Sequence, residues 1–324
     1  MKQQLDTLFG FGWPIVGWLV GSLCIPITIL PWILTRFFGK MRERRLKKVL
    51  QDKVVLITGA SSGLGEALAH AFYCSGCRVV LAARRVSELE RVRETLLTTH
   101  TNVTTHPPVI LPLDLSDINS IPGHVAKVLS IFGHIDILVN NAGVSYRGTV
   151  ATTSIDVDIK LMLVNYFGQV ALTKAVLPSM IERHSGHIVA ISSVQGRFAI
   201  PYRSAYAASK HALQAFCDTA RAELADHNIK VSVISPGYIR TSLSVNAMTG
   251  SGKAYGVMDS TTAGGYAPAY VANQVLQAIA DEKNEVILSP VSPRLAILIR
   301  TLTPSLYFWL MENRARRQNK EIST

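Results

Sequence analysis

The sequence has few of the residues from which proteins build disulfide frameworks or metal centres. It carries four scattered cysteines among 324 residues, and its nine histidines show no metal-ligand spacing. Cys74 and Cys77 form C-S-G-C at the end of a helical pattern, whereas a reactive thiolate is favoured at a helix N-terminus. We therefore expect no metal site and assign these cysteines to core or connecting positions, reduced as in cytosolic proteins.

Internal repeats and low-complexity linkers are also missing between residues 53 and 290. Their absence excludes a solenoid and argues against several tethered domains in this region. With 48% hydrophobic residues, the chain is long enough to bury a full core as one large domain or two small ones.

Charge is missing altogether from Thr7 to Thr35, a run long enough to cross a bilayer as a helix. A cleaved signal peptide is the competing interpretation, but the start is weakly basic and no small-residue cleavage site precedes the charged residues. We therefore expect a retained membrane anchor. Because Pro14, Pro26 and Pro31 kink or break helices, a re-entrant hairpin is the alternative form.

A basic segment follows the uncharged run. Residues 36–48, R-F-F-G-K-M-R-E-R-R-L-K-K, hold seven basic residues and one acidic residue, a net +6 of the chain's +11. Such a flank stays on the cytosolic side of a membrane and can rest on anionic headgroups. Nucleic-acid binding is another use of a basic run, but the adjacent apolar segment favours the membrane. Residues 1–50 are thus predicted to be an anchor with a basic flank, without a nucleic-acid partner.

Between residues 51 and 293, short β-branched runs alternate with longer amphipathic stretches, which is typical of βαβ units. The predicted strands are 53–58, 78–82, 109–113, 136–140, 187–192, 230–235 and 285–289. The predicted helices are 64–75, 86–98, 119–132, 155–184, 204–227 and 268–280. The expected fold is α/β, a single doubly wound Rossmann-type parallel sheet of about seven strands, with an N-terminal membrane anchor.

The last segment, residues 294–324, is apolar and then basic. Arg300 and Pro304 interrupt it too often for a membrane span, and three arginines follow the apolar part. A segment lying in the membrane interface and an ordinary helix packed on the core are equally good interpretations.

The first predicted strand leads directly into T-G-A-S-S-G-L-G, where Gly59, Gly63 and Gly65 fall at a strand-to-helix turn. Glycines there allow a tight turn and a close approach of the backbone to a pyrophosphate, which the helix N-terminus attracts. The second strand ends in A-A-R-R, with Arg84 and Arg85 where NAD-binding folds usually place a carboxylate for the ribose. Guanidinium groups suit a phosphate, so NADP(H) is the predicted cofactor; solvated arginines at a helix start are the alternative.

Tyr206 and Lys210 lie four residues apart in the helix-forming stretch S-A-Y-A-A-S-K-H, hence on one helix face. A lysine beside a phenol lowers its pKa and makes it a usable acid or base; a surface pair is the plain alternative. Three further features follow predicted strands, namely N-N-A-G at 140–143, Ser193, and P-G-Y-I-R-T at 236–241. In open α/β sheets, ligands bind at that edge.

With Asn165 in the long fourth helix, these motifs in this order resemble the short-chain dehydrogenase/reductase family over residues 50–290. The resemblance implies that Tyr206 exchanges a proton with the substrate oxygen while hydride moves to or from the cofactor. It also implies that Lys210 lowers the Tyr206 pKa and holds the nicotinamide ribose, that Ser193 binds the substrate oxygen, and that Asn165 positions a water.

The family pattern also implies a cofactor site. In that site Asp114 meets the adenine and Thr241 the carboxamide. The full predicted set is Gly59, Ser61, Ser62, Gly63, Leu64, Gly65, Arg84, Arg85, Asp114, Asn140, Ala142, Gly143, Tyr206, Lys210, Pro236, Gly237 and Thr241.

The segments that set the substrate are variable in such folds, so family membership does not determine it. Arg147, Arg197 and Arg203 lie in or near these segments and, with Ser193, are the predicted substrate residues. Similarity to membrane-anchored family members implies reduction of acyl- or alkyl-dihydroxyacetone phosphate. Retinal or steroid ketone reduction is the alternative, favoured if the arginines face away from the pocket, and a non-catalytic membrane scaffold is a further one.

The expected location is the endoplasmic reticulum membrane with the catalytic domain in the cytosol. The peroxisomal membrane and the lipid-droplet surface are alternatives, since the chain ends K-E-I-S-T without a retention or peroxisomal signal. Family analogy suggests a homo-oligomer.

Overall fold

The computed structural model describes residues 33–323 except 38, 40 and 43, and gives no side-chain placement for 319–323. The chain divides into two compact units, residues 1–49 and 50–324. In the first unit, residues 33–37 and 44–49 are helical. The predicted anchor lies outside the described residues, apart from its last three positions. Among the described residues, none of the helices is both long enough and apolar enough to cross a bilayer.

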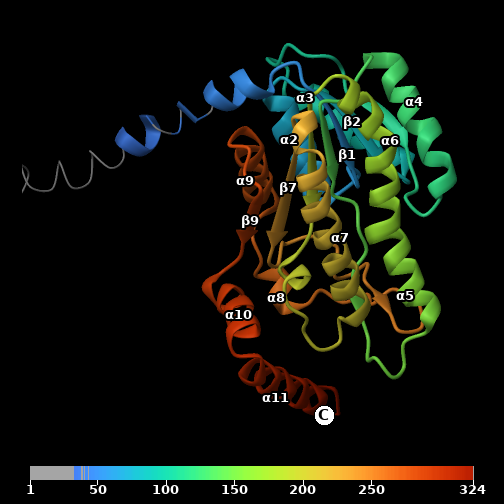
Figure 1. Ribbon diagram of the computed structural model, residues 1–324, viewed down its shortest axis with the longest axis vertical. Coiled ribbons are helices and arrows are strands. Elements are labelled where there is room, and N and C mark those ends of the chain that lie inside the picture. The colour runs from blue at the N-terminus through green and yellow to red at the C-terminus, as the bar shows by residue number, and fades with distance from the viewer. Residues whose placement is uncertain (1–32, 38, 40, 43, 324) are drawn as a thin grey trace, which may run out of the picture. The chain divides into compact units, whose positions relative to one another are not determined.

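Seven strands form one parallel sheet in the order β3-β2-β1-β4-β6-β7-β9 (Figure 1). Their bounds are β1 (Val54–Thr58), β2 (Arg78–Ala83), β3 (Val109–Pro112), β4 (Ile137–Asn140), β6 (Gly186–Ile191), β7 (Ile229–Pro236) and β9 (Glu285–Leu288). All seven predicted strands are present. β-branched runs suit a sheet that is covered on both faces, and the predicted α/β fold is confirmed.

Helices cover both faces of the sheet. On one side α2 (Gly63–Cys74) packs against α9 (Pro268–Ala280), and on the other α4 (Ile121–Phe132) packs against α6 (Gly168–Glu182) (Figure 1). Two further long helices of this unit are α3 (Val86–Thr99) and α7 (Ser204–Glu223). A large core cluster includes fully buried side chains such as Leu56, Leu138 and Leu172. Strand order reverses between β1 and β4, the point at which open α/β sheets bind ligands.

The predicted helix 155–184 is interrupted. It consists of α5 (Ile155–Met162), a π-helical turn (Leu163–Phe167) and α6. Gly168 starts α6 where a Cβ would lie 2.2 Å from the Leu115 carbonyl oxygen, so the close approach of these segments requires glycine. A π-helical turn is common at functional sites, and its buried residue is Asn165.

Several short elements were not predicted, because they are too short to show a hydrophobic periodicity in the sequence. A second sheet pairs β5 (Tyr146–Arg147) with β8 (Met248–Thr249) in parallel. Short helical turns are η1 (Ile118–Ser120), η3 (Val194–Gly196), η4 (Ala225–His227) and α8 (Ser260–Ala263). The predicted helix 119–132 therefore begins as a separate 3₁₀ turn.

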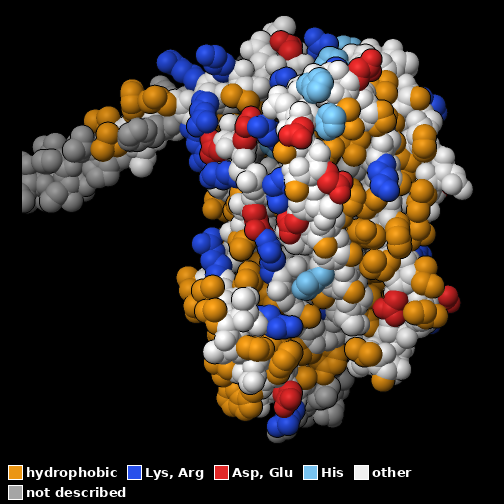
Figure 2. All heavy atoms as spheres, viewed as in Figure 1, with side chains coloured by type: hydrophobic (Ala, Val, Ile, Leu, Met, Phe, Trp, Pro, Cys, Tyr) orange, Lys and Arg blue, Asp and Glu red, His pale blue; other side chains and the backbone are white. Residues whose placement is uncertain are grey.

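The C-terminal segment forms two helices, α10 (Val291–Leu302) and α11 (Pro304–Ser323). Proline suits the first position of a helix because its missing N–H would have no partner there. Tyr307 is buried against Phe198, and its hydroxyl donates to the Ala199 carbonyl. The other face exposes large apolar side chains, and Figure 2 shows hydrophobic side chains gathered over these helices. One face thus packs on the core as in the second interpretation, while the opposite face remains apolar and exposed.

Candidate active site

The turn after β1 forms a cradle of backbone at the N-terminus of α2. Gly59 and Gly63 have φ values of +67° and +61°, which glycine adopts without strain. At Gly65 a Cβ would lie 2.1 Å from the Gly59 carbonyl oxygen, so only glycine permits this turn. The arrangement leaves the first N–H groups of α2 beside open space, as an anion requires.

The loop after β4 is anchored to β1 by Asn141 rather than by its neighbour. Asn141 Nδ2 donates to the Thr58 carbonyl at 2.8 Å, and Thr58 Oγ1 accepts the N–H groups of Asn141 and Ala142. Asn140 instead turns into the core, where its Nδ2 donates to Thr173 Oγ1. The prediction that Asn140 lines the cofactor site is therefore wrong in position, because side chains alternate between the faces of a strand. That alternation could have indicated Asn141.

Two arginines and an aspartate lie at the far end of the cleft from Tyr206. Arg85 Nη2 donates to the hydroxyls of Ser61 and Ser62, both at 3.1 Å, and Arg84 is exposed beside it. Burial raises the pKa of Asp114, but the backbone and hydroxyl hydrogen bonds from Ser116 outweigh it, and the pKa lies below its usual value. The charge at the end of β2 is positive, as predicted.

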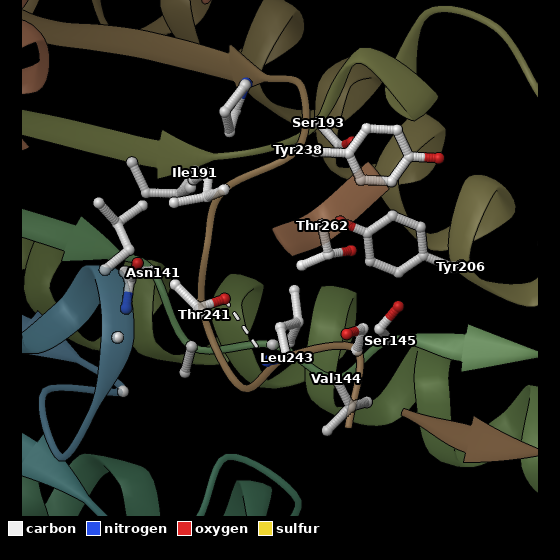
Figure 3. Close-up of a pocket in the computed structure, with 18 of the residues that line it drawn as sticks. Asn141, Val144, Ser145, Ile191, Ser193, Tyr206, Tyr238, Thr241, Leu243 and Thr262 are labelled. Atoms are coloured by element: carbon white, nitrogen blue, oxygen red, sulfur yellow. Dashed lines mark hydrogen bonds between the residues drawn. The ribbon is translucent and has the colours of Figure 1, made fainter. Parts of the chain in front are cut away.

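The reacting end gathers hydroxyl groups around Tyr206. Figure 3 shows Ser145, Ser193, Tyr206 and Thr262 around one end of the cleft. Ser193 follows β6 and Tyr206 lies in the first turn of α7, so the two elements bring together residues that are distant in the sequence. Tyr206 is 9% exposed.

Lys210 lies one turn further along α7 and is buried. Its Nζ donates to the Ile191 carbonyl at 2.9 Å and lies 5.9 Å from the Tyr206 ring centroid. Burial lowers the pKa of Lys210 from 10.5 to about 8. The two side chains share one helix face, as their spacing predicted.

A single cleft of about 960 Å³ connects both ends along the carboxyl edge of the sheet. All the predicted cofactor residues except Asn140 line it, and so do Ser193 and Arg147. Sequence reasoning missed two groups of lining residues. Thr58, Asn141 and Tyr238 belong to the quoted motifs but were not assigned to the site, whereas Ser145, Thr262, Tyr266 and Arg314 come from loops, α8 and α11, which carry no family motif. A glycine cradle at one end, a buried acid–base pair at the other and an elongated space between them fit a dinucleotide.

Comparison with known proteins agrees with this geometry. The family model described as short chain dehydrogenase matches residues 53–251. A Dehydrogenase/reductase SDR family protein 7-like of Anopheles gambiae is 61% identical over 302 residues, covering 93% of this chain and 95% of that protein. The Dehydrogenase/reductase SDR family member 7B of Bos taurus is 47% identical over 307 residues, covering 94% of both chains.

This chain belongs to the short-chain dehydrogenase family. Among solved structures, a short-chain dehydrogenase from Streptomyces avermitilis has a TM-score of 0.67 at 30% identity and covers 82% of this chain and 98% of its own. A metagenomic short-chain oxidoreductase in complex with NADP has a TM-score of 0.60 at 30% identity, covering 74% and 99%. The protein is accordingly an NAD(P)-dependent oxidoreductase.

Burial, rather than Lys210, dominates the pKa of the dehydrogenase's Tyr206 in this arrangement. Burial raises the pKa of Tyr206, and the hydrogen bond with Ser193 and the positive charge of Arg147 only partly oppose it. Lys210 instead directs its ammonium group to the Ile191 carbonyl. Desolvation outweighs the neighbouring charges because it penalises the phenolate directly.

Asn165 does not line the cleft of the dehydrogenase but holds its wall. The side chain is fully buried; Oδ1 accepts the Val144 N–H at 2.8 Å, and Nδ2 donates to the Val144 carbonyl at 2.9 Å and to Ser209 Oγ at 3.0 Å. Val144 lies in the cleft wall between Gly143 and Ser145. The geometry gives Asn165 a positioning role, and its predicted contact with water stays a prediction.

The three arginines predicted to contact substrate do not act as one group. Arg147 lines the cleft, but its Nε donates to Asp259 at 2.9 Å. Arg197 lies outside the cleft and pairs with Glu285 on β9, and the partly buried Arg203 is not among the residues that line the cleft. The predictions for Arg197 and Arg203 are wrong in position, and for Arg197 the reason is that Glu285, distant in the sequence, draws the side chain away.

Proposed function

We propose that this dehydrogenase uses NADPH to reduce a ketone carried on a lipid, with acyl- and alkyl-dihydroxyacetone phosphate as the substrate class. The observation that carries the choice of cofactor is the pair Arg84 and Arg85 lining the cleft at the end of β2. Arg85 sits over Ser61 and Ser62 and can pair with a 2′-phosphate, as guanidinium groups do. The metagenomic relative solved with NADP supports the same choice.

The side chains at the other end suit proton transfer to a carbonyl oxygen. When bound, the dinucleotide supplies the hydride that the carbonyl carbon accepts. Tyr206 gives its phenolic proton to the oxygen, and the Ser193 hydroxyl hydrogen-bonds that oxygen as negative charge develops. Lys210 would hold the ribose of the dinucleotide, and the glycine cradle with the α2 N-terminus would hold its pyrophosphate. The product is the alcohol.

The substrate end of the cleft combines apolar walls with positive charge. Val194, Phe198, Ile200 and Leu243 line it, and Arg314 of α11 contributes a further guanidinium. Arg147 and Arg203 share one carboxylate, Asp259, which leaves one positive charge in excess beside the cleft. An apolar chain ending in a phosphate matches both properties.

A neutral ketone such as retinal or a steroid is the second candidate. It is favoured by the pairing of Arg147 with Asp259 and of Arg197 with Glu285, which leaves less positive charge free for an anionic group.

We also propose that α10 and α11 lie against the membrane surface. Leu298 and Leu302 of α10 and Phe308 and Trp309 of α11 are each more than half exposed. From residue 291 to 318, five arginines face one glutamate, which suits anionic headgroups. Brominated lipids should quench Trp309, measured as the difference in emission between the full chain and Trp309→Phe in the same vesicles. An unquenched Trp309 would contradict membrane contact.

The catalytic unit is proposed to face the cytosol at the endoplasmic reticulum membrane, with the peroxisomal membrane and lipid-droplet surface as alternatives. A homo-oligomer is proposed as well. Ile155 and Ile159 on α5 and Phe167 in the π-helical turn are about half exposed or more, and a second copy could cover them.

The test is NADPH oxidation by the purified full chain with palmitoyl-dihydroxyacetone phosphate, all-trans-retinal and a steroid ketone. Tyr206→Phe should lower kcat by about 10²- to 10⁴-fold, the contribution of a positioned general acid, while fluorescence titration shows unchanged NADPH binding. Turnover confined to the phosphate lipid supports the proposal. Turnover of the neutral ketones alone would replace the substrate, and full activity of Tyr206→Phe would refute the mechanism.

A further inference from the structure

One carboxylate joins three parts of the chain at the reacting end of the cleft. Asp259 Oδ2 accepts hydrogen bonds from Nε and Nη2 of Arg147, and Arg203 Nη2 lies 3.6 Å from the same oxygen. The side chains of Arg147, Asp259 and Arg203 are only 9%, 17% and 12% exposed. Water therefore screens this ion cluster weakly.

The three residues belong to different elements around the cleft, and of the three only Arg147 itself lines it. Arg147 is on β5, and its Nη1 also donates to the Ser145 hydroxyl at 2.8 Å. Arg203 directly precedes α7, three residues before Tyr206. Asp259 belongs to the cover segment, residues 242–265, whose Leu243, Ser244, Asn246 and Thr262 line the cleft.

Asp259 also organises the cover segment itself. It caps α8, and its backbone oxygen accepts the N–H groups of Thr262 and Ala263, both at 2.9 Å. Thr262 then points into the space next to Tyr206 (Figure 3). The side chain and the backbone of one residue thus tie the cover segment to β5 and to the start of α7.

The cluster is not electrically balanced. Two guanidinium groups face one carboxylate, and Arg203 Nε is buried with no hydrogen-bond partner among the described residues. Burial, and next the charge of Arg147, lower the pKa of Arg203 to about 10. Both arginines favour the phenolate form of Tyr206 and thereby lower its pKa against the larger effect of burial.

We propose that Asp259 is a positioning residue that holds the cover segment closed over the reacting end of the cleft and limits the positive charge beside Tyr206. This inference rests on the proposed role of Tyr206 as the proton donor. It does not depend on which ketone is the substrate.

The sign of the charge effect follows from the groups around Tyr206. These are Ser193 after β6, Tyr238 after β7, Lys210 on α7, the two arginines of the cluster, and Tyr255 in the cover segment beside Arg147. Asp259 is the acidic group of the cluster, so its removal leaves the positive charge of the arginines less opposed. The phenolate becomes more favourable and the pKa of Tyr206 falls. Because ketone reduction needs the protonated phenol, the alkaline limb of the pH–rate profile moves to lower pH.

The experiment compares Asp259→Asn with Asp218→Asn in the full chain. Asp218 is a matched control, since it pairs with Arg221 on the exposed side of α7, away from the cleft. Asp259→Asn should move the alkaline limb of kcat/KM to lower pH by up to about one pH unit, the order of the effect of a unit charge in a weakly screened site. Hydrogen–deuterium exchange in peptides from 242–265 should also become faster. Asp218→Asn should change neither property.

Two further variants separate charge from closure. Asp259→Glu keeps the charge, so its alkaline limb should stay at the wild-type pH. Arg203→Gln removes a positive charge, so its limb should move to higher pH, and this variant tests the charge effect even where Asp259→Asn does not fold. Unchanged limbs in Asp259→Asn and Arg203→Gln would overturn the charge effect, and unchanged exchange in 242–265 would overturn the closure.

Failure of the proposed function gives a different result. If Tyr206→Phe retains full activity, the proton donor is another group and the pH argument has no basis. If Tyr206→Phe is inactive while Asp259→Asn behaves as Asp218→Asn does, the mechanism holds and the role of Asp259 is refuted.

Discussion

Replacing Asn165 by alanine tests how the π-helical turn supports the active site. The side chain is fully buried and makes three hydrogen bonds, two to the backbone of Val144 and one to Ser209. Alanine makes none of them. Val144 forms part of the cleft wall between Gly143 and Ser145, so its backbone would lose the groups that hold it in place.

The cost can be worked from these partners. Val144 is only partly buried, so water can reach its freed N–H and carbonyl groups. Each lost hydrogen bond should therefore cost about 1 kcal/mol, less than the loss of a bond by a polar group that is fully buried. Ser209 keeps its hydrogen bond to the Tyr206 carbonyl. Adding a small cavity, Asn165→Ala should lower the free energy of unfolding by about 2–4 kcal/mol. A domain with about 5–15 kcal/mol remains folded after such a loss.

The assay is urea unfolding of the detergent-solubilised chain, followed by far-UV circular dichroism, with kcat/KM measured in parallel. Asn102→Ala, in an exposed turn, is the control and should change the free energy of unfolding by less than about 0.5 kcal/mol. We expect Asn165→Ala to reduce kcat/KM at least about tenfold, since a shift near 1 Å in a catalytic wall has effects of this size. A loss of stability below about 1 kcal/mol with normal activity would refute the reasoning.

Two further predictions concern charge. Arg85→Glu should raise KM for NADPH about tenfold or more, because a charge-assisted hydrogen bond to the cofactor is lost, and should favour NADH. Steady-state kinetics with both coenzymes measure this change. An unchanged preference for NADPH would contradict the prediction. Burial lowers the pKa of His187 from 6.5 to about 4. The unfolded chain therefore binds a proton between those values that the folded chain does not, and stability falls by up to about 3 kcal/mol as pH drops through this window. Urea unfolding at pH 7 and pH 4 should show that His187→Gln removes this loss of stability. If the variant loses as much stability as the wild type, a group other than His187 is responsible.

Local patterns predicted most of the fold. Each β-branched run became a strand, because such residues suit a pleated surface covered on both faces. The glycine turn was predictable for the same local reason, since Gly59 and Gly63 need φ values that other residues avoid. Strands of two residues and the break at the π-helical turn show no periodic signal, and they were missed.

Site residues that belong to sequence motifs were predicted correctly. The predictions failed for side chains whose position depends on partners distant in the sequence. Asn140 and Asn141 are adjacent residues of the same type, and only the orientation of the strand determines which side chain faces the cleft. Arg197 was predicted to contact the substrate, but the fold places Glu285 of β9 beside it and the two side chains pair. The pairing of Arg147 with Asp259 joins residues 112 positions apart.

The sequence by itself determined the parallel α/β sheet, the cradle for a dinucleotide and the face on which Tyr206 and Lys210 meet, because each depends on residues within a few positions of one another. Only the tertiary structure decided which charges face the cleft, that Asn165 holds the Val144 wall, and that burial rather than Lys210 dominates the pKa of Tyr206. Desolvation and ion pairing depend on what the folded chain brings nearby, and no local spacing encodes them.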